Sequence, residues 1–209
     1  MNRSSIAIFA SGRGSNLQVI LDAVQAGDCP VDVRLVISDR ADAAALTIAR
    51  QCGVAHVIHV DPKAFPSREQ YDAHCAELID QHAIQWIVLA GYMRILSAPF
   101  VRRFPGRIIN IHPSILPAFT GAHAIEDALR YGVKVSGCTV HLVDEVLDGG
   151  PILAQAVVPV HDDDSVESLH ARIQQEEHRI YPATLKRLVE ARFQIDGRRV
   201  IWQQPSQTA

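Results

Sequence analysis

The sequence lacks the features of several protein classes. No apolar run approaches the ~20 residues that a helix needs to cross a bilayer, and Ile6 to Ala10 near the start is too short for the core of a signal peptide. There is no basic run, and 20 Lys and Arg against 23 Asp and Glu give a net charge of −3. This balance argues against a nucleic-acid coat or a membrane-surface protein. We therefore expect a cytoplasmic protein that binds neither nucleic acid nor membrane.

Signals for disulfides and metal sites are also missing. The four cysteines, Cys29, Cys52, Cys75 and Cys138, are far apart and form no CxxC pair, so each is expected as a small core side chain in a reducing compartment. None of the ten histidines belongs to an HExxH motif or another recognisable ligand spacing. We expect neither a disulfide framework nor a metal.

Length and composition predict one globular domain. The 209 residues suffice for one α/β domain and are too few for two ordinary ones. Hydrophobic residues make up 48% and charged residues 21%, the balance of a protein with a full core. No repeat, linker or low-complexity tract interrupts the chain, so residues 1–209 are expected to form a single unit.

Short apolar segments alternate with helical patterns along the first ninety residues. The apolar segments predict strands at 6–10, 31–37, 55–60 and 86–90. Helices are expected between them, at about 17–24, 42–51 and 71–82. Segments that are apolar on both faces are typical of a parallel sheet covered by helices, and the alternation gives right-handed βαβ units. The prediction is an open Rossmann-like α/β sheet with helices on both faces.

The pattern changes after a fifth expected strand at 107–111. Strands at 135–143 and 152–160 are joined by too few residues for a crossover helix, so they are predicted to form a C-terminal antiparallel pair in a mostly parallel sheet. A last helix is expected to begin near Asp164 with a capping box at Glu167, and Pro182 is expected to kink or end it. Residues 195–202 have the pattern of a terminal hairpin, and the tail from Gln203 is expected to be loose.

A glycine-rich turn, Ser11 to Leu17, follows the first strand and opens the first helix. Backbone N–H groups at the positive end of a helix suit a phosphate. Leu17 stands where a dinucleotide fingerprint has its third glycine, and no Gly-Lys-Ser/Thr of a P-loop is present. The turn predicts a cradle for a single phosphate, with Ser15 and Asn16 as donors. Two alternatives remain: a plain turn capped by Ser15 or Asn16, and a nicotinamide site with Asp39 on the ribose.

A second candidate site is the segment Asn110-Ile-His-Pro113. Alternate residues of a strand share a face, so Asn110 and His112 point the same way, and Pro113 keeps His112 extended. Open α/β sheets bind ligands beyond the carboxyl ends of their strands. An amide beside an imidazole can stabilise an oxyanion and move a proton, and Asp148 is an available carboxylate partner. The alternatives are a histidine bonded to backbone and a plain Asp-Gly-Gly turn.

One acidic residue of the last expected helix falls on its apolar stripe. Glu177 lies four residues after Ile173 and three before Ile180. A carboxylate on a buried stripe costs several kcal/mol unless a partner meets it. Glu177 is therefore predicted to face a ligand, the alternative being a residue at the edge of the stripe that reaches water.

Three segments, 88–96, 109–117 and 147–153, resemble the folate-dependent formyltransferases, and the resemblance runs from Ser11 to about Pro182. It implies an enzyme that transfers the formyl group of 10-formyltetrahydrofolate, a co-substrate, to the amine of 5′-phosphoribosylglycinamide (GAR) in de novo purine (IMP) biosynthesis. We expect the amine to attack the formyl group directly in a ternary complex, without a metal. The protein is expected to be a monomer or a homodimer. The N-terminal half would bind the nucleotide phosphate, and the C-terminal half would bind folate and carry the catalytic groups.

The resemblance also implies site residues. The catalytic residues are expected to be Asn110, His112 and Asp148. The GAR-binding residues are expected to be Gly14, Ser15, Asn16, Gln174 and Glu177. The folate-binding residues are expected to be Arg68, Met93, Arg94, Ile95, Leu96, Asn110, Asp144, Glu145, Val146, Leu147 and Asp148. Ala118 and Thr120 stand where many relatives have a basic residue and a proline, so the loop between Pro117 and Gly121 is expected to differ in shape or charge.

Related activities remain as alternatives. A formyltetrahydrofolate hydrolase shares the Asn, His and Asp set but passes the formyl group to water, and it is expected to carry an additional N-terminal domain. A methionyl-tRNA formyltransferase needs a further C-terminal domain and a basic surface. A non-catalytic module would bind folate and nucleotide without turnover.

Overall fold

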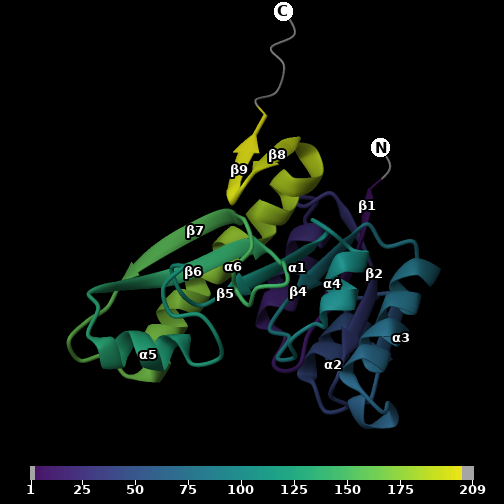
Figure 1. The fold of residues 1–209 in the computed structure, drawn as a ribbon, viewed down its shortest axis with the longest axis horizontal. Coiled ribbons are helices and arrows are strands. Elements are labelled where there is room, and N and C mark those ends of the chain that lie inside the picture. Colours follow the sequence, from purple (N-terminus) through teal and green to yellow (C-terminus); the bar gives the residue numbers. More distant parts are fainter. Residues whose placement is uncertain (1–2, 204–209) are drawn as a thin grey trace, which may run out of the picture.

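The computed structural model describes residues 3–203, and these contain two sheets (Figure 1). The larger sheet has seven strands in the order β3-β2-β1-β4-β5-β6-β7, and β8 and β9 form a separate hairpin. The strands are β1 (Ser4–Phe9), β2 (Val31–Ser38), β3 (His56–His59), β4 (Trp86–Leu89), β5 (Ile108–His112), β6 (Val135–Leu142), β7 (Ile152–Pro159), β8 (Phe193–Asp196) and β9 (Arg199–Trp202). The helices are α1 (Ser15–Gln25), α2 (Ala44–Gln51), η1 (Pro62–Ala64), α3 (Arg68–Gln81), α4 (Ala98–Arg103), α5 (Ala124–Tyr131) and α6 (Val166–Glu190).

The strand directions confirm the predicted fold class. β1 to β5 are parallel, β6 runs antiparallel to β5, and β7 runs antiparallel to β6. The chain crosses from β3 back to β4 beside β1, so the strand order reverses between β1 and β4. A reversal of this kind opens a crevice at the carboxyl ends of the strands, where ligands bind in open α/β sheets. The loops after β1, β4 and β5 all lie at this edge.

Two cores cover the two faces of the sheet, as predicted. Alternate residues of β1 separate between them, because successive side chains of a strand point to opposite faces. Ile6 and Ile8 pack with α1, α2 and α6 on one face, and Ala7 and Phe9 pack with α3 and α4 on the other. All four of these side chains are fully buried.

The start of α6 differs from the prediction. Its N-cap is Ser165, and the capping box is made with Ser168, because the two hydroxyls each accept a hydrogen bond from the other residue's backbone N–H. Glu167 is therefore not the box residue. Asp164 precedes the cap and instead accepts hydrogen bonds from the guanidinium of Arg172, one at 2.7 Å. Because the Asp164 carboxylate is engaged by Arg172, Ser165 provides the cap and the helix begins at Val166.

Pro182 does not end α6, which continues to Glu190. A proline inside a helix removes one backbone hydrogen bond and costs about 3 kcal/mol. Packing on both sides of the proline offsets this cost: Tyr181 and Leu185 are fully buried, and the Tyr181 hydroxyl donates to the Leu89 carbonyl at 2.9 Å. Of the two predicted effects of Pro182, a kink or an end of the helix, the end was wrong, because tertiary contacts outweighed local propensity.

The predicted terminal hairpin is present as β8 and β9. It packs against α6, with the Arg187 guanidinium 4.2 Å from the centre of the Trp202 ring. The expectation for the tail lies mostly outside the described residues, which end at Gln203. Between residues 3 and 203, no helix is both long and apolar enough to cross a membrane.

Candidate active site

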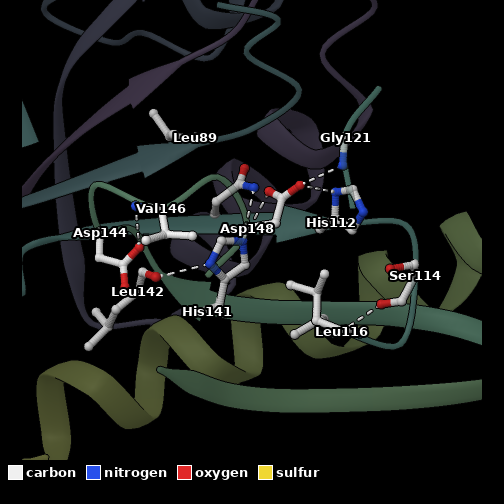
Figure 2. Close-up of polar contacts among 12 residues, drawn as sticks. Leu89, His112, Ser114, Leu116, Gly121, His141, Leu142, Asp144, Val146 and Asp148 are labelled. Carbon is white, nitrogen blue, oxygen red and sulfur yellow. Dashed lines mark hydrogen bonds and ion pairs between the residues drawn. The ribbon is translucent and has the colours of Figure 1, made fainter. Parts of the chain in front are cut away.

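Asn110 and His112 come from the end of β5. The structure places Asp148 beside His112 (Figure 2). Asp148 lies in the connection between β6 and β7 and has φ +53°, in the left-handed region. Two glycines follow it because there is no room for a side chain: a Cβ on Gly149 would lie 2.6 Å from the Val146 Cβ, and one on Gly150 would lie 1.8 Å from the Leu142 oxygen. The Asp-Gly-Gly sequence thus folds the connection tightly back over β5.

The side chains of Asp148 and His112 lie side by side and are both buried. One carboxylate oxygen of Asp148 lies 3.6 Å from Nδ1 of His112, and both side chains are less than a tenth exposed. The same oxygen accepts a hydrogen bond from the Gly121 N–H at 2.8 Å. On the other side of the ring, Nε2 of His112 lies 2.8 Å from the Phe119 carbonyl oxygen. The Phe119 carbonyl can only accept, so this contact suits a ring with a proton on Nε2.

A further histidine, which sequence reasoning missed, completes the cluster. His141 on β6 is the direct cross-strand partner of Asn110 in the antiparallel register. Its Nε2 lies 3.1 Å from Nδ2 of Asn110 and 3.8 Å from the second carboxylate oxygen of Asp148, and its Nδ1 lies 2.9 Å from the Leu142 oxygen. Burial lowers the pKa of His141 below its ordinary value. The only sequence signal was a histidine in a strand of otherwise small and apolar residues.

A cavity of about 330 Å³ opens beside this cluster. Most of its lining comes from the loop after β4, the end of β5 and the connection between β6 and β7, and His141 of β6 also borders it. Several apolar side chains at this place are more than half exposed, an arrangement typical of a surface that receives an apolar ligand. They are Met93, Ile95, Val146 and Leu147.

All but one of the residues expected to bind folate line this cavity. Arg94 is among them, and its guanidinium stacks over the Tyr71 ring at 4.8 Å. Glu145 also lines it and pairs with Arg102 at 2.7 Å. The exception is Arg68, which begins α3 and lies 3.7 Å from Glu69. The structure therefore gathers the expected folate residues except Arg68.

A second cavity, of about 360 Å³, lies at the glycine-rich turn. The turn residues Ser11 to Asn16 line one side, and α6 lines the other with His170, Gln174 and Glu177. Gly14 is the N-cap of α1 with φ 77° and no side-chain cap. Neither Ser15 nor Asn16 caps the helix, so the plain-turn alternative in that form was wrong.

Hydrogen bonds between α1 and α6 link the side chains that line this second cavity. Gln174 donates to the Ser15 hydroxyl at 3.0 Å, and Asn16 donates from Nδ2 to Glu177 at 2.9 Å. Glu177 is buried, which confirms its predicted place on the apolar stripe, and burial raises the pKa of its carboxyl. The buried Oδ1 of Asn16 has no hydrogen-bond partner among residues 3–203.

His170 is a second residue of the site that sequence reasoning missed. It precedes Gln174 by four positions, so it lies one helical turn away on the same face of α6. Burial and the nearby charge of Arg13 lower its pKa. The same helical spacing that pointed to Glu177 was a signal for His170.

The two cavities share part of their lining. Gly91, Met93, Ile111 and Pro113 border both of them, directly beside His112. Two ligands bound in the two cavities would therefore meet beside the cluster of Asn110, His112 and Asp148. This is the arrangement that a transfer between two bound substrates requires.

Comparison with known proteins identifies the family. The family model described as formyl transferase matches residues 4–185. Phosphoribosylglycinamide formyltransferase of Escherichia coli strain K12 is 43% identical over 204 residues, which cover 94% of this chain and 95% of the relative. The chain belongs to the formyl transferase family.

Solved structures of formyl transferases share its fold. Glycinamide ribonucleotide transformylase 1 from Symbiobacterium toebii is 50% identical with a TM-score of 0.94, over 97% of this chain and 95% of that one. A formyltetrahydrofolate deformylase from Pseudomonas syringae pv. tomato is 29% identical with a TM-score of 0.88, over 97% of this chain and 67% of that one. The two structures thus share one fold under different activity names, a transformylase and a deformylase.

Proposed function

We propose that this chain transfers the formyl group of 10-formyltetrahydrofolate to the amine of GAR, as a cytoplasmic enzyme of purine biosynthesis. The observation that carries the proposal is the position of Asn110, His112 and Asp148 where the two cavities meet. The names of the E. coli and Symbiobacterium relatives support the same acceptor.

Each cavity suits one of the two substrates. The cavity beside Met93 and Val146 is apolar enough for the pterin, and its backbone loops offer hydrogen bonds to the ring edge. Arg68, outside that cavity, is the proposed partner of the acidic tail of the folate. The cavity at the glycine-rich turn presents the N-terminal end of α1 at Ser15, which suits the phosphate of GAR. The N-terminal half thus binds the phosphate, and the C-terminal half binds folate and carries the catalytic groups.

Glu177 and Gln174 are proposed to hold the ribose and the glycinamide arm of GAR. Both line the second cavity from α6. A buried carboxylate that only one amide contacts retains acceptor capacity for hydroxyl or amine protons of a ligand.

The proposed reaction is a direct transfer. The amine of GAR attacks the formyl carbon, a C–N bond forms, and the carbonyl electrons move to oxygen. Nδ2 of Asn110 and Nε2 of His112 donate hydrogen bonds to this oxyanion, each worth roughly 10²- to 10³-fold in rate. For this, His112 exchanges the Phe119 carbonyl for the substrate oxygen. The bond to N10 of the folate then breaks, and the proton lost by the amine ends on N10.

Asp148 is proposed to stabilise the protonated ring of His112 and to orient a water that relays the proton. Its carboxylate is buried beside the ring, so its charge acts at short range. Such general acid–base assistance contributes roughly 10²- to 10⁴-fold. Among the described residues that line the first cavity there is no Cys, Ser, Thr or Lys, which favours a ternary complex over a formyl-enzyme intermediate.

The decisive experiment follows the ultraviolet absorbance of 10-formyltetrahydrofolate with and without GAR, with mass spectrometry of the products. We expect loss of the formyl group only when GAR is present, with formyl-GAR as the product. Equal loss without GAR, with release of formate, would instead identify a hydrolase. Binding of both ligands without any turnover would overturn the enzymatic proposal altogether.

A further inference from the structure

We propose that His141 is a positioning residue that acts as a neutral imidazole and fixes the side-chain amide of Asn110. The kinetic part of this inference rests on the proposed function, and the geometric part stands on the contacts alone. His141 borders the first cavity, but its role in this proposal is to act through Asn110 and not to give a proton to the substrate.

The contacts of His141 define its tautomer. Nδ1 lies 2.9 Å from the Leu142 carbonyl oxygen, which can only accept, so Nδ1 carries a proton. His141 is 2% exposed, and burial lowers its pKa, which favours the neutral ring. The hydrogen bond to the Leu142 carbonyl and the Asp148 and Asp144 carboxylates act in the opposite direction but are outweighed by burial. A neutral ring with a proton on Nδ1 has a lone pair on Nε2. Nε2 of His141 is therefore an acceptor.

This acceptor orients the Asn110 amide. Nε2 lies 3.1 Å from Nδ2 of Asn110, so one N–H of the amide donates to the ring. The opposite amide orientation would place two acceptors, the Asn110 oxygen and the ring lone pair, against each other. The second N–H of Nδ2 stays available for the oxyanion, and the cross-strand pairing of Asn110 with His141 keeps the two side chains in register.

The same tautomer of His141 keeps the Asp148 carboxylate available to interact with His112. Asp148 lies between the two rings, with one oxygen 3.6 Å from Nδ1 of His112 and the other 3.8 Å from Nε2 of His141 (Figure 2). A protonated His141 would pair with this carboxylate and would lose its bond from Asn110. A neutral His141 has no proton on Nε2 to offer, so the carboxylate charge remains directed at the His112 ring.

The kinetic test compares two substitutions at one position. His141→Leu removes the acceptor, and we expect kcat to fall by roughly 10- to 100-fold, the range seen when residues that orient metal ligands are replaced. KM for both substrates is expected to change little. His141→Gln places an amide oxygen near the position of Nε2 and is expected to retain most of the turnover. Val140→Ala, on the opposite face of β6 and fully buried, controls for lost stability and should leave kcat unchanged.

A double-mutant cycle identifies Asn110 as the residue through which His141 acts. In an Asn110→Ala background, His141→Leu should cost little further turnover, because its target is already gone. Multiplicative losses from the two substitutions, or an unchanged kcat in His141→Leu, would overturn the inference while leaving the proposed function intact.

Nuclear magnetic resonance tests the geometry without turnover. Long-range proton–nitrogen spectra of the histidine-labelled protein at neutral pH should show His141 with a protonated Nδ1 and an unprotonated Nε2. His141→Leu should shift the side-chain amide signals of Asn110, and Val140→Ala should leave them in place. A His141 ring protonated on Nε2 would overturn the inference, whether or not the protein formylates GAR.

Discussion

At the scale of single residues, Asp148 combines charge and backbone strain at one position. Its left-handed φ of +53° is rare for residues other than glycine, although aspartate and asparagine adopt it more readily than most. Strain of this kind persists only where the surroundings impose it. Here the two following positions leave no room for a side chain, and the Asp148 carboxylate accepts a hydrogen bond from the Gly121 N–H and lies beside His112.

Asp148→Asn tests the charge separately from the backbone. Asparagine tolerates the left-handed conformation, so we expect the fold and folate binding to be retained while kcat falls by roughly 10²- to 10⁴-fold. Steady-state kinetics and folate titration of the purified variant measure both effects. Asp162→Asn, an exposed residue paired with Lys134, is the control for a lost carboxylate elsewhere. Near-normal kcat in Asp148→Asn would remove Asp148 from the proposed mechanism.

At the scale of elements, the turn between β1 and α1 depends on one glycine. Gly14 has φ 77°, and a Cβ at this position would lie 2.8 Å from the Ala45 Cα on α2. The close approach of α2 is also marked by the hydrogen bond from the Ala45 N–H to the Gly12 carbonyl at 3.1 Å. Packing and one hydrogen bond from α2 therefore fix the position of the turn that lines the second cavity.

Gly14→Ala is expected to lower the free energy of unfolding by about 1–3 kcal/mol, because backbone must move to admit the methyl group. It should also raise KM for GAR, since the displaced turn lines the GAR cavity. Gly27→Ala is the matched control, with φ +81° but no atom within 4 Å of the added Cβ, so only the backbone strain is shared. Equal losses of stability in the two variants, measured by urea unfolding, would rule out the contact with Ala45 as the cause.

At the scale of the whole molecule, Glu177 links stability to pH. Because burial raises its pKa in the folded chain, the folded state binds a proton more tightly than the unfolded state does. Its stabilising contribution is complete at acid pH and is lost as the pH rises through the folded pKa. The charged carboxylate that we propose binds GAR is thus kept at a cost in stability near neutrality.

Glu177→Gln keeps an acceptor for the Asn16 amide and removes the charge. We expect its Tm to exceed that of the unaltered protein at about pH 8 and the difference to shrink toward about pH 5, with each kcal/mol worth ~2–4 °C in a chain of this size. KM for GAR should rise. Glu176→Gln, the neighbouring residue paired with Arg179 at the surface, is the control. A stabilisation that does not vary with pH would contradict the assignment to Glu177.

Local sequence patterns predicted what depends on neighbouring residues. Alternation and helical spacing predicted the strands of the sheet and the buried position of Glu177. The end of α6 could not be predicted in this way, because contacts of Tyr181 with distant strands carry the helix through Pro182. The short helices α4 and α5 were likewise missed, since six and eight residues give too little periodicity.

In the candidate site, too, local patterns predicted some residues, and contacts between distant segments determined the others. Asn110 and His112 share a face by strand alternation, and the carboxylate partner Asp148 was named from its glycine-ended connection. The part played by His141 depends on the register between β5 and β6, which no single segment of sequence encodes. Arg68 was expected near folate, yet it lies outside the lining of the cavity.

The wall shared by the two cavities has a thermodynamic consequence. Met93 stands in that wall, is 75% exposed, and has an unbranched, adaptable side chain. If a ligand in one cavity shifts the Met93 side chain, the shape of the other cavity changes. The affinity of that other cavity for its own ligand then changes as well. Linkage makes this cooperativity reciprocal: the factor by which the first ligand changes the affinity for the second equals the factor by which the second changes the affinity for the first. Through such a movement of Met93, each ligand would act as an effector of the other.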